Sequence, residues 1–86
     1  MVTTTIYMIL TGKFKGKTVQ IEQINFQDPH ILHKLDNIGL TVGAIIKVLD
    51  FNTDKKLLYL SIYNVDYVLR ESDCYGVEVK EISEEN

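Results

Sequence analysis

A helical pattern of apolar residues, followed by a strand pattern, stands out between residues 28 and 48. Asp28 and Pro29 suit a helix start, because Asp accepts hydrogen bonds from free N–H groups and proline fits the first helical position. Gly39 suits the left-handed position after a helix end, where Leu40 can fold back onto the last turn. The apolar residues between them fall on one helical face: Ile31, Leu32, Leu35 and Ile38. The pattern predicts a helix over residues 29–38, then a turn and a strand.

The remainder of the chain alternates apolar and polar residues with the period of β-strands. Residues 17–22 place Val19 and Ile21 inside and Thr18 in water. Residues 45–51 are almost all apolar, and their β-branched content favours a strand. Further strands are expected over residues 58–63, 67–69 and 77–80, with polar turns at 52–56 and 64–66 and a short helical turn at 70–74.

About five short antiparallel strands, with one helix after the first, predict a mainly β fold. At 86 residues a small, partly open antiparallel barrel is favoured over a sandwich. We expect one domain over residues 1–86, with a core over about 9–82 and an acidic tail that frays after Ile82. The apolar run at residues 6–10 is far shorter than the ~20 residues of a transmembrane helix. We therefore expect neither direct membrane insertion nor a signal peptide.

The net charge of −3 argues against a nucleic-acid-binding protein, which usually gathers Lys and Arg on one face. Residues 13–17 alternate lysine with Phe14 and Gly16, a pattern that can contact phosphates or stack a base. Three lysines in an acidic chain favour a solvated loop instead. The single cysteine, Cys74, excludes an intrachain disulfide and is compatible with a reducing cytoplasm.

Candidate metal ligands recur every three residues on the predicted helix: His30, His33 and Asp36. Neighbouring imidazoles can hold Zn²⁺ or Fe²⁺. A solvated helix face is favoured, because no further Cys/His pair completes a four-ligand set. Cys74 is expected to pack as a small apolar residue rather than act as a nucleophile. Since no catalytic set or dinucleotide fingerprint stands out, we expect neither an enzyme nor a bound cofactor.

Residues 35–43, LDNIGLTVG, resemble the motif of the FeoA family, in which a short helix ends in Gly-Leu, a turn and a second Gly. The strands over 58–63, 67–70 and 77–79 are similar to that family's hairpin and final strand, and residues 12–21 to its opening. Val42 stands where the family usually has Pro, a substitution that a turn tolerates. The resemblance implies an SH3-like barrel. It also implies a small cytoplasmic accessory protein of ferrous iron uptake that binds the membrane GTPase transporter FeoB.

Exposed apolar residues near the turn and the hairpin are the candidate partner surface, since tyrosine is enriched in protein interfaces: Leu40, Val42, Tyr59 and Tyr63. An exposed apolar patch also predicts weak homo-oligomers. The alternative is a stand-alone regulatory or sensing domain that resembles the C-terminal domain of DtxR-type iron-dependent repressors. Such a repressor needs an attached helix-turn-helix domain, for which 86 residues leave no room.

Overall fold

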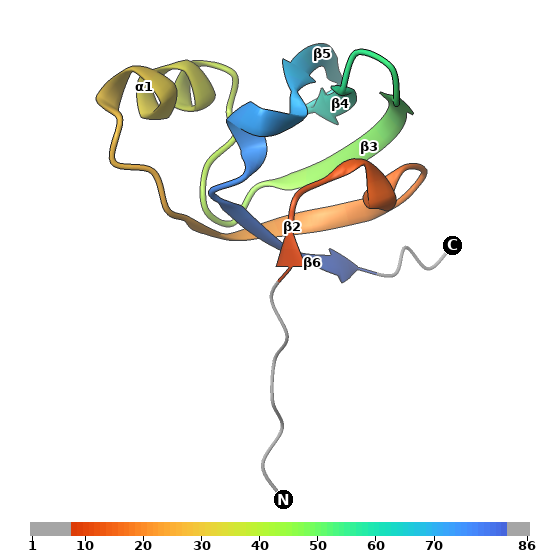
Figure 1. Cartoon of the computed structure of the whole chain (residues 1–86). Helices are drawn as coiled ribbons and strands as arrows, with labels where there is room; N and C mark the ends of the chain where they lie inside the picture. Colours follow the sequence, from red (N-terminus) through yellow and green to blue (C-terminus); the bar gives the residue numbers. More distant parts are fainter. Residues whose placement is uncertain (1–7, 83–86) are drawn as a thin grey trace, which may run out of the picture.

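Alternating apolar residues wrap one antiparallel sheet around a single core in the computed structural model, which describes residues 8–82 (Figure 1). The helix α1 lies to one side of this sheet. In chain order the elements are β1 (Met8–Ile9), the 3₁₀ turn η1 (Gly12–Phe14), β2 (Thr18–Ile24), α1 (Pro29–Asn37), β3 (Ile45–Asn52), β4 (Leu57–Ile62), β5 (Val65–Arg70), the 3₁₀ turn η2 (Glu71–Cys74) and β6 (Val77–Ile82).

The strands are ordered β1-β6-β2-β3-β4-β5, and every neighbouring pair is antiparallel. The predicted mainly β, SH3-like fold with one short helix is confirmed. The two-residue β1 adds a sixth strand to the predicted five, so the helix follows the second strand of the chain. Within residues 8–82 the sheet does not close on itself, since β1 and β5 remain its edges.

The core is formed by the inward residues of β2 to β6, together with Leu35 of α1 and buried residues of the 3₁₀ turns and loops. Val19 and Ile21 are buried, as their alternation predicts. The prediction that Thr18 lies in water is wrong, because its side chain is buried. Thr18 pairs with Lys47 on one side and with Ile82 on the other, so strands flank it on both edges.

The turn between β4 and β5 consists of Tyr63 and Asn64, and both residues have positive φ angles, 50° and 66°. Ile62 pairs with Val65, so this is a two-residue loop of the type I′ class that suits the twist of a hairpin. The predicted turn at 64–66 is therefore displaced, and β5 begins at Val65. Asn accepts positive φ readily, but Tyr does so rarely, and for this reason the sequence pattern did not place Tyr63 in the turn.

Residues 6 and 7 of the N-terminal apolar run and residues 83–86 of the acidic tail lie outside the described residues, and so does the expected fraying after Ile82. Within residues 8–82, no helix is long and apolar enough to cross a membrane.

Candidate protein-binding groove

The start of α1 is fixed by local chemistry. Asp28 Oδ1 accepts a hydrogen bond from the His30 N–H at 2.9 Å, and Pro29 occupies the first helical position. The helix is Pro29–Asn37, one residue shorter than predicted. The segment that leads into it is tied to the sheet, because the Asn25 N–H donates to the Gly76 carbonyl at 2.7 Å. The helix is therefore held beside the end of β2.

The end of α1 forms a Schellman cap, a pair of hydrogen bonds that closes the last turn around a left-handed residue. Gly39 is that residue, with a φ of +85°. Its N–H donates to the Asp36 carbonyl at 3.1 Å, and the Leu40 N–H donates to the Leu35 carbonyl at 3.0 Å. Leu40 is thereby folded back into the core and is fully buried.

A four-residue turn follows and carries Val42 at its tip. The Ala44 N–H donates to the Thr41 carbonyl at 3.0 Å, and Gly43 has a φ of +90°, the pattern of a type II turn. The Gly43 N–H donates to the Ile21 carbonyl at 2.8 Å, which fastens the turn to β2. Val42 is thus presented on a rigid support with 64% of its surface exposed.

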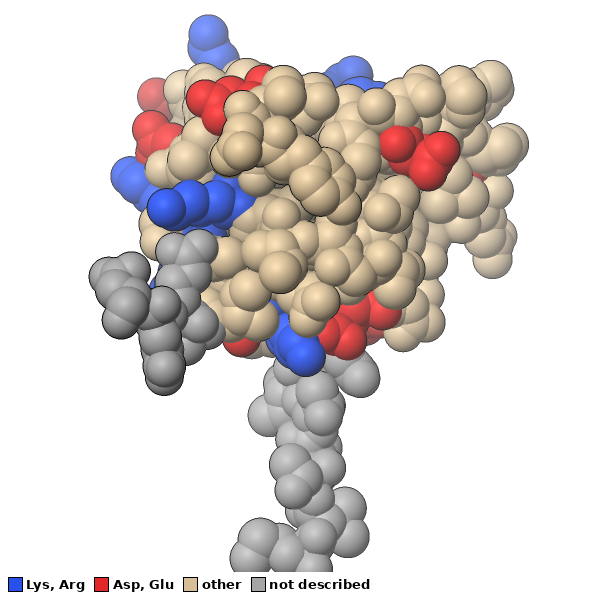
Figure 2. Space-filling model, turned by 180° about the vertical axis from the view of Figure 1, so that it is seen from behind, with Lys and Arg blue, Asp and Glu red and all other residues tan. Residues whose placement is uncertain are grey.

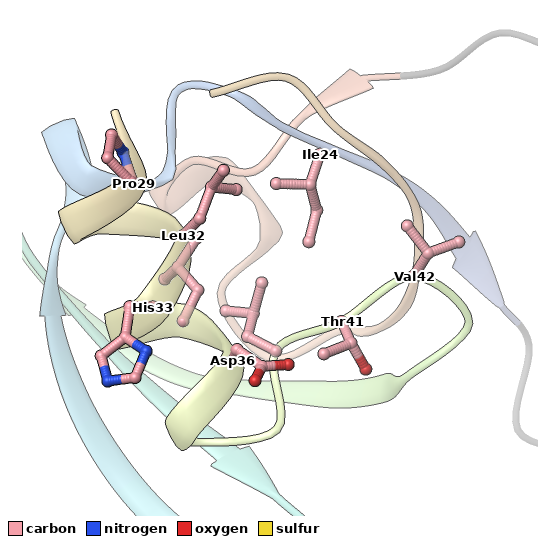
Figure 3. Close-up of a pocket in the computed structure, with 9 residues that line it drawn as sticks. Ile24, Pro29, Leu32, His33, Asp36, Thr41 and Val42 are labelled. Carbon is pink, nitrogen blue, oxygen red and sulfur yellow. The ribbon is translucent and has the colours of Figure 1, made fainter. Parts of the chain in front are cut away.

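A groove of about 460 Å³ lies between α1, the end of β2 and this turn (Figure 3). Its lining consists of Ile24, Pro29, Leu32, His33, Leu35, Asp36, Leu40, Thr41 and Val42. Leu35 and Leu40 are buried beneath it, whereas Leu32 and Val42 stay exposed at its rim. A concave site with mostly apolar walls and a few polar groups is the usual form of a binding site.

The polar groups gather at one end of the groove. In Figure 3 the Asp36 carboxylate and the Thr41 side chain lie near one another, while Ile24, Leu32 and Val42 surround the other end. The His33 imidazole points away from the middle of the groove. An apolar ligand that carries one hydrogen-bond donor or positive charge would match this distribution.

The residues of the predicted helical trio, His30, His33 and Asp36, are all exposed. Among residues 8–82, no three His, Cys, Asp or Glu side chains lie close enough together to hold a metal ion. His33 and Asp36 belong to the rim of the groove, but His30 does not.

The structure corrects part of the predicted partner surface. Leu40 is buried because the Schellman cap turns it inward, so the expectation that it is exposed is wrong. Val42 and Tyr63 are exposed, at 64% and 70%, and Tyr59 is half-buried on β4. Val42 alone among these four lies in the exposed rim of the groove.

Three other residues of the groove were not predicted from the sequence to belong to a binding surface: Ile24, Leu32 and Thr41. The pattern placed Leu32 on the apolar face of the helix, together with Leu35. The pattern did not show that Leu32, unlike Leu35, stays exposed to solvent instead of packing on the sheet. Ile24 lies past the predicted end of its strand, so only the fold brings it opposite Leu32.

Cys74 is fully buried in the core, as a packing residue would be. Burial, reinforced by the negative charge of Asp73, raises the pKa of the Cys74 thiol to about 12. A nucleophilic cysteine needs a lowered pKa and access to solvent. The structure therefore supports the packing interpretation of Cys74.

The lysine-rich segment at residues 13–17 lies in η1 and the loop after it. Phe14 is buried and cannot stack on a base. Lys15 pairs with Asp50 at 3.1 Å, and Lys17 pairs with Glu81 at 2.9 Å. On the face shown in Figure 2, basic side chains lie apart near the edges, beside acidic ones, around an uncharged middle.

Together these features define a small SH3-like domain with an apolar groove beside its helix. A family model described as the FeoA domain matches residues 13–81, and the chain belongs to the FeoA family. No curated protein matches the chain.

Solved structures share this fold. The crystal structure of an iron uptake regulatory protein, FeoA, has a TM-score of 0.76 at 22% identity and covers 91% of this chain and 100% of that one. The NMR structure of a FeoA-like protein from Clostridium acetobutylicum has a TM-score of 0.79 at 17% identity, covering 96% and 95%. A manganese-dependent transcriptional repressor has a TM-score of 0.83 at 19% identity. It covers 92% of this chain, which spans only 43% of the repressor's length.

Proposed function

We propose that this protein is a non-enzymatic, cytoplasmic accessory protein of ferrous iron uptake that binds the cytoplasmic part of a FeoB-like transporter. The observation that carries the proposal is the membership of residues 13–81 in the FeoA family. The groove between α1 and the turn at Val42 is the proposed docking site.

The chemistry of the groove supports a protein ligand. Leu32 and Val42 expose apolar surface at its rim, and burying such surface favours association by roughly 25 cal/mol per Å² before entropy costs. Asp36 and Thr41 at one end supply acceptors that can orient a partner segment. The cap at Gly39 and the turn at Gly43 hold both walls rigidly, which lowers the entropy cost of binding.

The experiment is a binding titration between the purified protein and the purified cytoplasmic domain of the FeoB-like transporter, by calorimetry. We expect Val42→Glu to weaken binding at least tenfold, because a charge would be buried against the partner. Ile45→Glu is the matched control, since Ile45 is also exposed, at 53%, but lies on β3 outside the groove.

Both variants must first show the urea unfolding midpoint of the parent. Loss of binding in Val42→Glu with retention in Ile45→Glu supports the groove. Equal binding by all three proteins excludes the groove, and absence of binding by the parent excludes the interaction itself.

The alternative function is that of a metal-sensing domain. The similarity of the fold to that of the manganese-dependent repressor, with a TM-score of 0.83, supports this alternative. A sensor must bind its metal ion. Anaerobic calorimetry with Fe²⁺ and with Mn²⁺ separates the two functions, because the accessory function predicts only weak binding. A stoichiometric, submicromolar site that disappears in His30→Ala plus His33→Ala would favour the sensor.

A further inference from the structure

One edge of the sheet, formed by the six-residue strand β5, has no neighbouring strand among the described residues. The opposite edge is the two-residue β1, which offers little backbone for pairing. A long edge strand with apolar residues readily pairs with another chain. β5 has that character, because Val65 and Val68 are both at least half exposed.

The hairpin geometry identifies which backbone groups of β5 are free. In a two-residue loop the closing pair, Ile62 and Val65, exchanges both hydrogen bonds, and hydrogen-bonded pairs then alternate along the ladder. Tyr67 and Leu69 are therefore bonded to β4. The N–H and C=O groups that face away from β4 belong to Asp66, Val68 and Arg70. No turn, loop or side-chain hydrogen bond within residues 8–82 uses the backbone of these three residues.

This set of free groups is self-complementary. If two copies of β5 pair antiparallel with Val68 opposite Val68 of the second copy, Asp66 of each chain lies opposite Arg70 of the other. Opposite charges directly across a ladder stabilise the pair, and like charges destabilise it. Both side chains are available for this contact, since Asp66 is exposed and the Arg70 side chain is 74% exposed. Among the described residues, the ion pair of Arg70 is a long contact of 3.9 Å with Asp73, which Lys34 approaches more closely at 3.1 Å.

The outward face of the sheet supports the same register. Val68 pairs with Tyr59 on β4, and Tyr59 lies opposite the bulged residues of β3, where Leu49 is exposed. These three side chains form an apolar row that ends at the free edge of β5. Pairing through Val68 would join this row to the same row of the second chain.

We infer that the protein forms a two-fold symmetric dimer by pairing of its β5 edges, centred on Val68, with two Asp66–Arg70 pairs between the chains. The dimer extends the six-stranded sheet across two copies. It rests on the sheet edge alone, and it is independent of the transporter-binding groove.

A charge exchange tests this register. Sedimentation equilibrium from micromolar to millimolar concentration gives the dissociation constant of the dimer. Asp66→Arg and Arg70→Asp, tested singly, are each expected to raise that constant about tenfold, because two attractive pairs become repulsive. The double variant is expected to return within about threefold of the parent. A double variant as weak as the single ones would overturn the register.

Cross-linking provides a second measurement that does not depend on charge. In a hydrogen-bonded antiparallel pair the Cα atoms are about 5.5 Å apart, a separation that a disulfide spans. Val68→Cys should therefore link two chains under mild oxidation at least tenfold faster than Ile45→Cys. Ile45 has the same exposure, 53% against 54%, but lies on β3, and the native Cys74 is buried and does not compete.

Faster linking at Val68→Cys with a charge-sensitive dimer supports the proposal. A protein that is monomeric up to millimolar concentration and links equally slowly at both positions overturns it. A dimer that is unaffected by the single charge changes and does not link through Val68→Cys uses another surface, and also overturns it.

Discussion

Two features of the structure require a glycine at position 39: its backbone conformation and its close contact with a neighbouring ring. Its φ of +85° is a conformation that a side chain disfavours, and it lies against the Tyr63 ring. A Cβ atom at this position would meet Tyr63 at 3.0 Å. Gly43 has a similar φ of +90°, but a Cβ atom there would meet nothing within 4 Å. A comparison of alanine substitutions at the two glycines therefore distinguishes the effect of backbone strain from that of the steric contact with Tyr63.

We predict that Gly43→Ala lowers the free energy of unfolding by about 1 kcal/mol, through backbone strain alone. Gly39→Ala should lower it by more, about 2 kcal/mol, because the Tyr63 ring must also move. Urea unfolding monitored by circular dichroism measures both. Equal losses in the two variants would show that the Tyr63 contact contributes nothing.

Cys74 makes stability depend on alkaline pH. Its pKa is raised to about 12 in the folded protein, above the ordinary value of 9.0. The contribution of this thiol to stability is therefore complete below about pH 9 and is lost as the pH rises toward 12. We predict that the urea midpoint of the parent falls between about pH 8 and about pH 10.5 more steeply than that of Cys74→Ala. Parallel pH profiles of the two proteins would contradict this prediction.

At the element scale, α1 shows what a sequence pattern can predict. Asp28, Pro29 and Gly39 act through their immediate neighbours, so the start and end of the helix follow from local chemistry, to within one residue. The turn at Tyr63 and Asn64 could not be placed in the same way. There the pairing of β4 with β5 imposes a positive φ on a tyrosine, against its own preference.

The apolar face of α1 is divided between core and surface. Leu35 is buried, whereas Leu32, three residues earlier on the same face, is exposed at the groove. We predict that Leu35→Ala costs about 2–5 kcal/mol of unfolding free energy, since it leaves a cavity in the core. Leu32→Ala should cost less than about 1 kcal/mol, because water already reaches this side chain. Similar losses in urea unfolding would show that both residues are equally buried.

At the scale of the whole molecule, the mainly β fold followed from the alternation of apolar residues and from the resemblance of residues 35–43 to the FeoA motif. The groove did not. Its walls come from β2, α1 and the turn at Val42, and no local pattern shows that Ile24 faces Leu32. Leu40 illustrates the limit: its position after Gly39 predicted that it folds back, yet its apolar character alone also made it a surface candidate.

We propose that this protein supports ferrous iron uptake through its groove. The most direct measurement is the initial rate of Fe²⁺ uptake by cells that carry the FeoB-like transporter but lack this protein, complemented with the parent, Val42→Glu or Ile45→Glu at equal abundance. We predict that the parent and Ile45→Glu restore uptake, and that Val42→Glu leaves the rate near that of uncomplemented cells. Full uptake with Val42→Glu would contradict the role of the groove, and unchanged uptake with the parent would contradict the function itself.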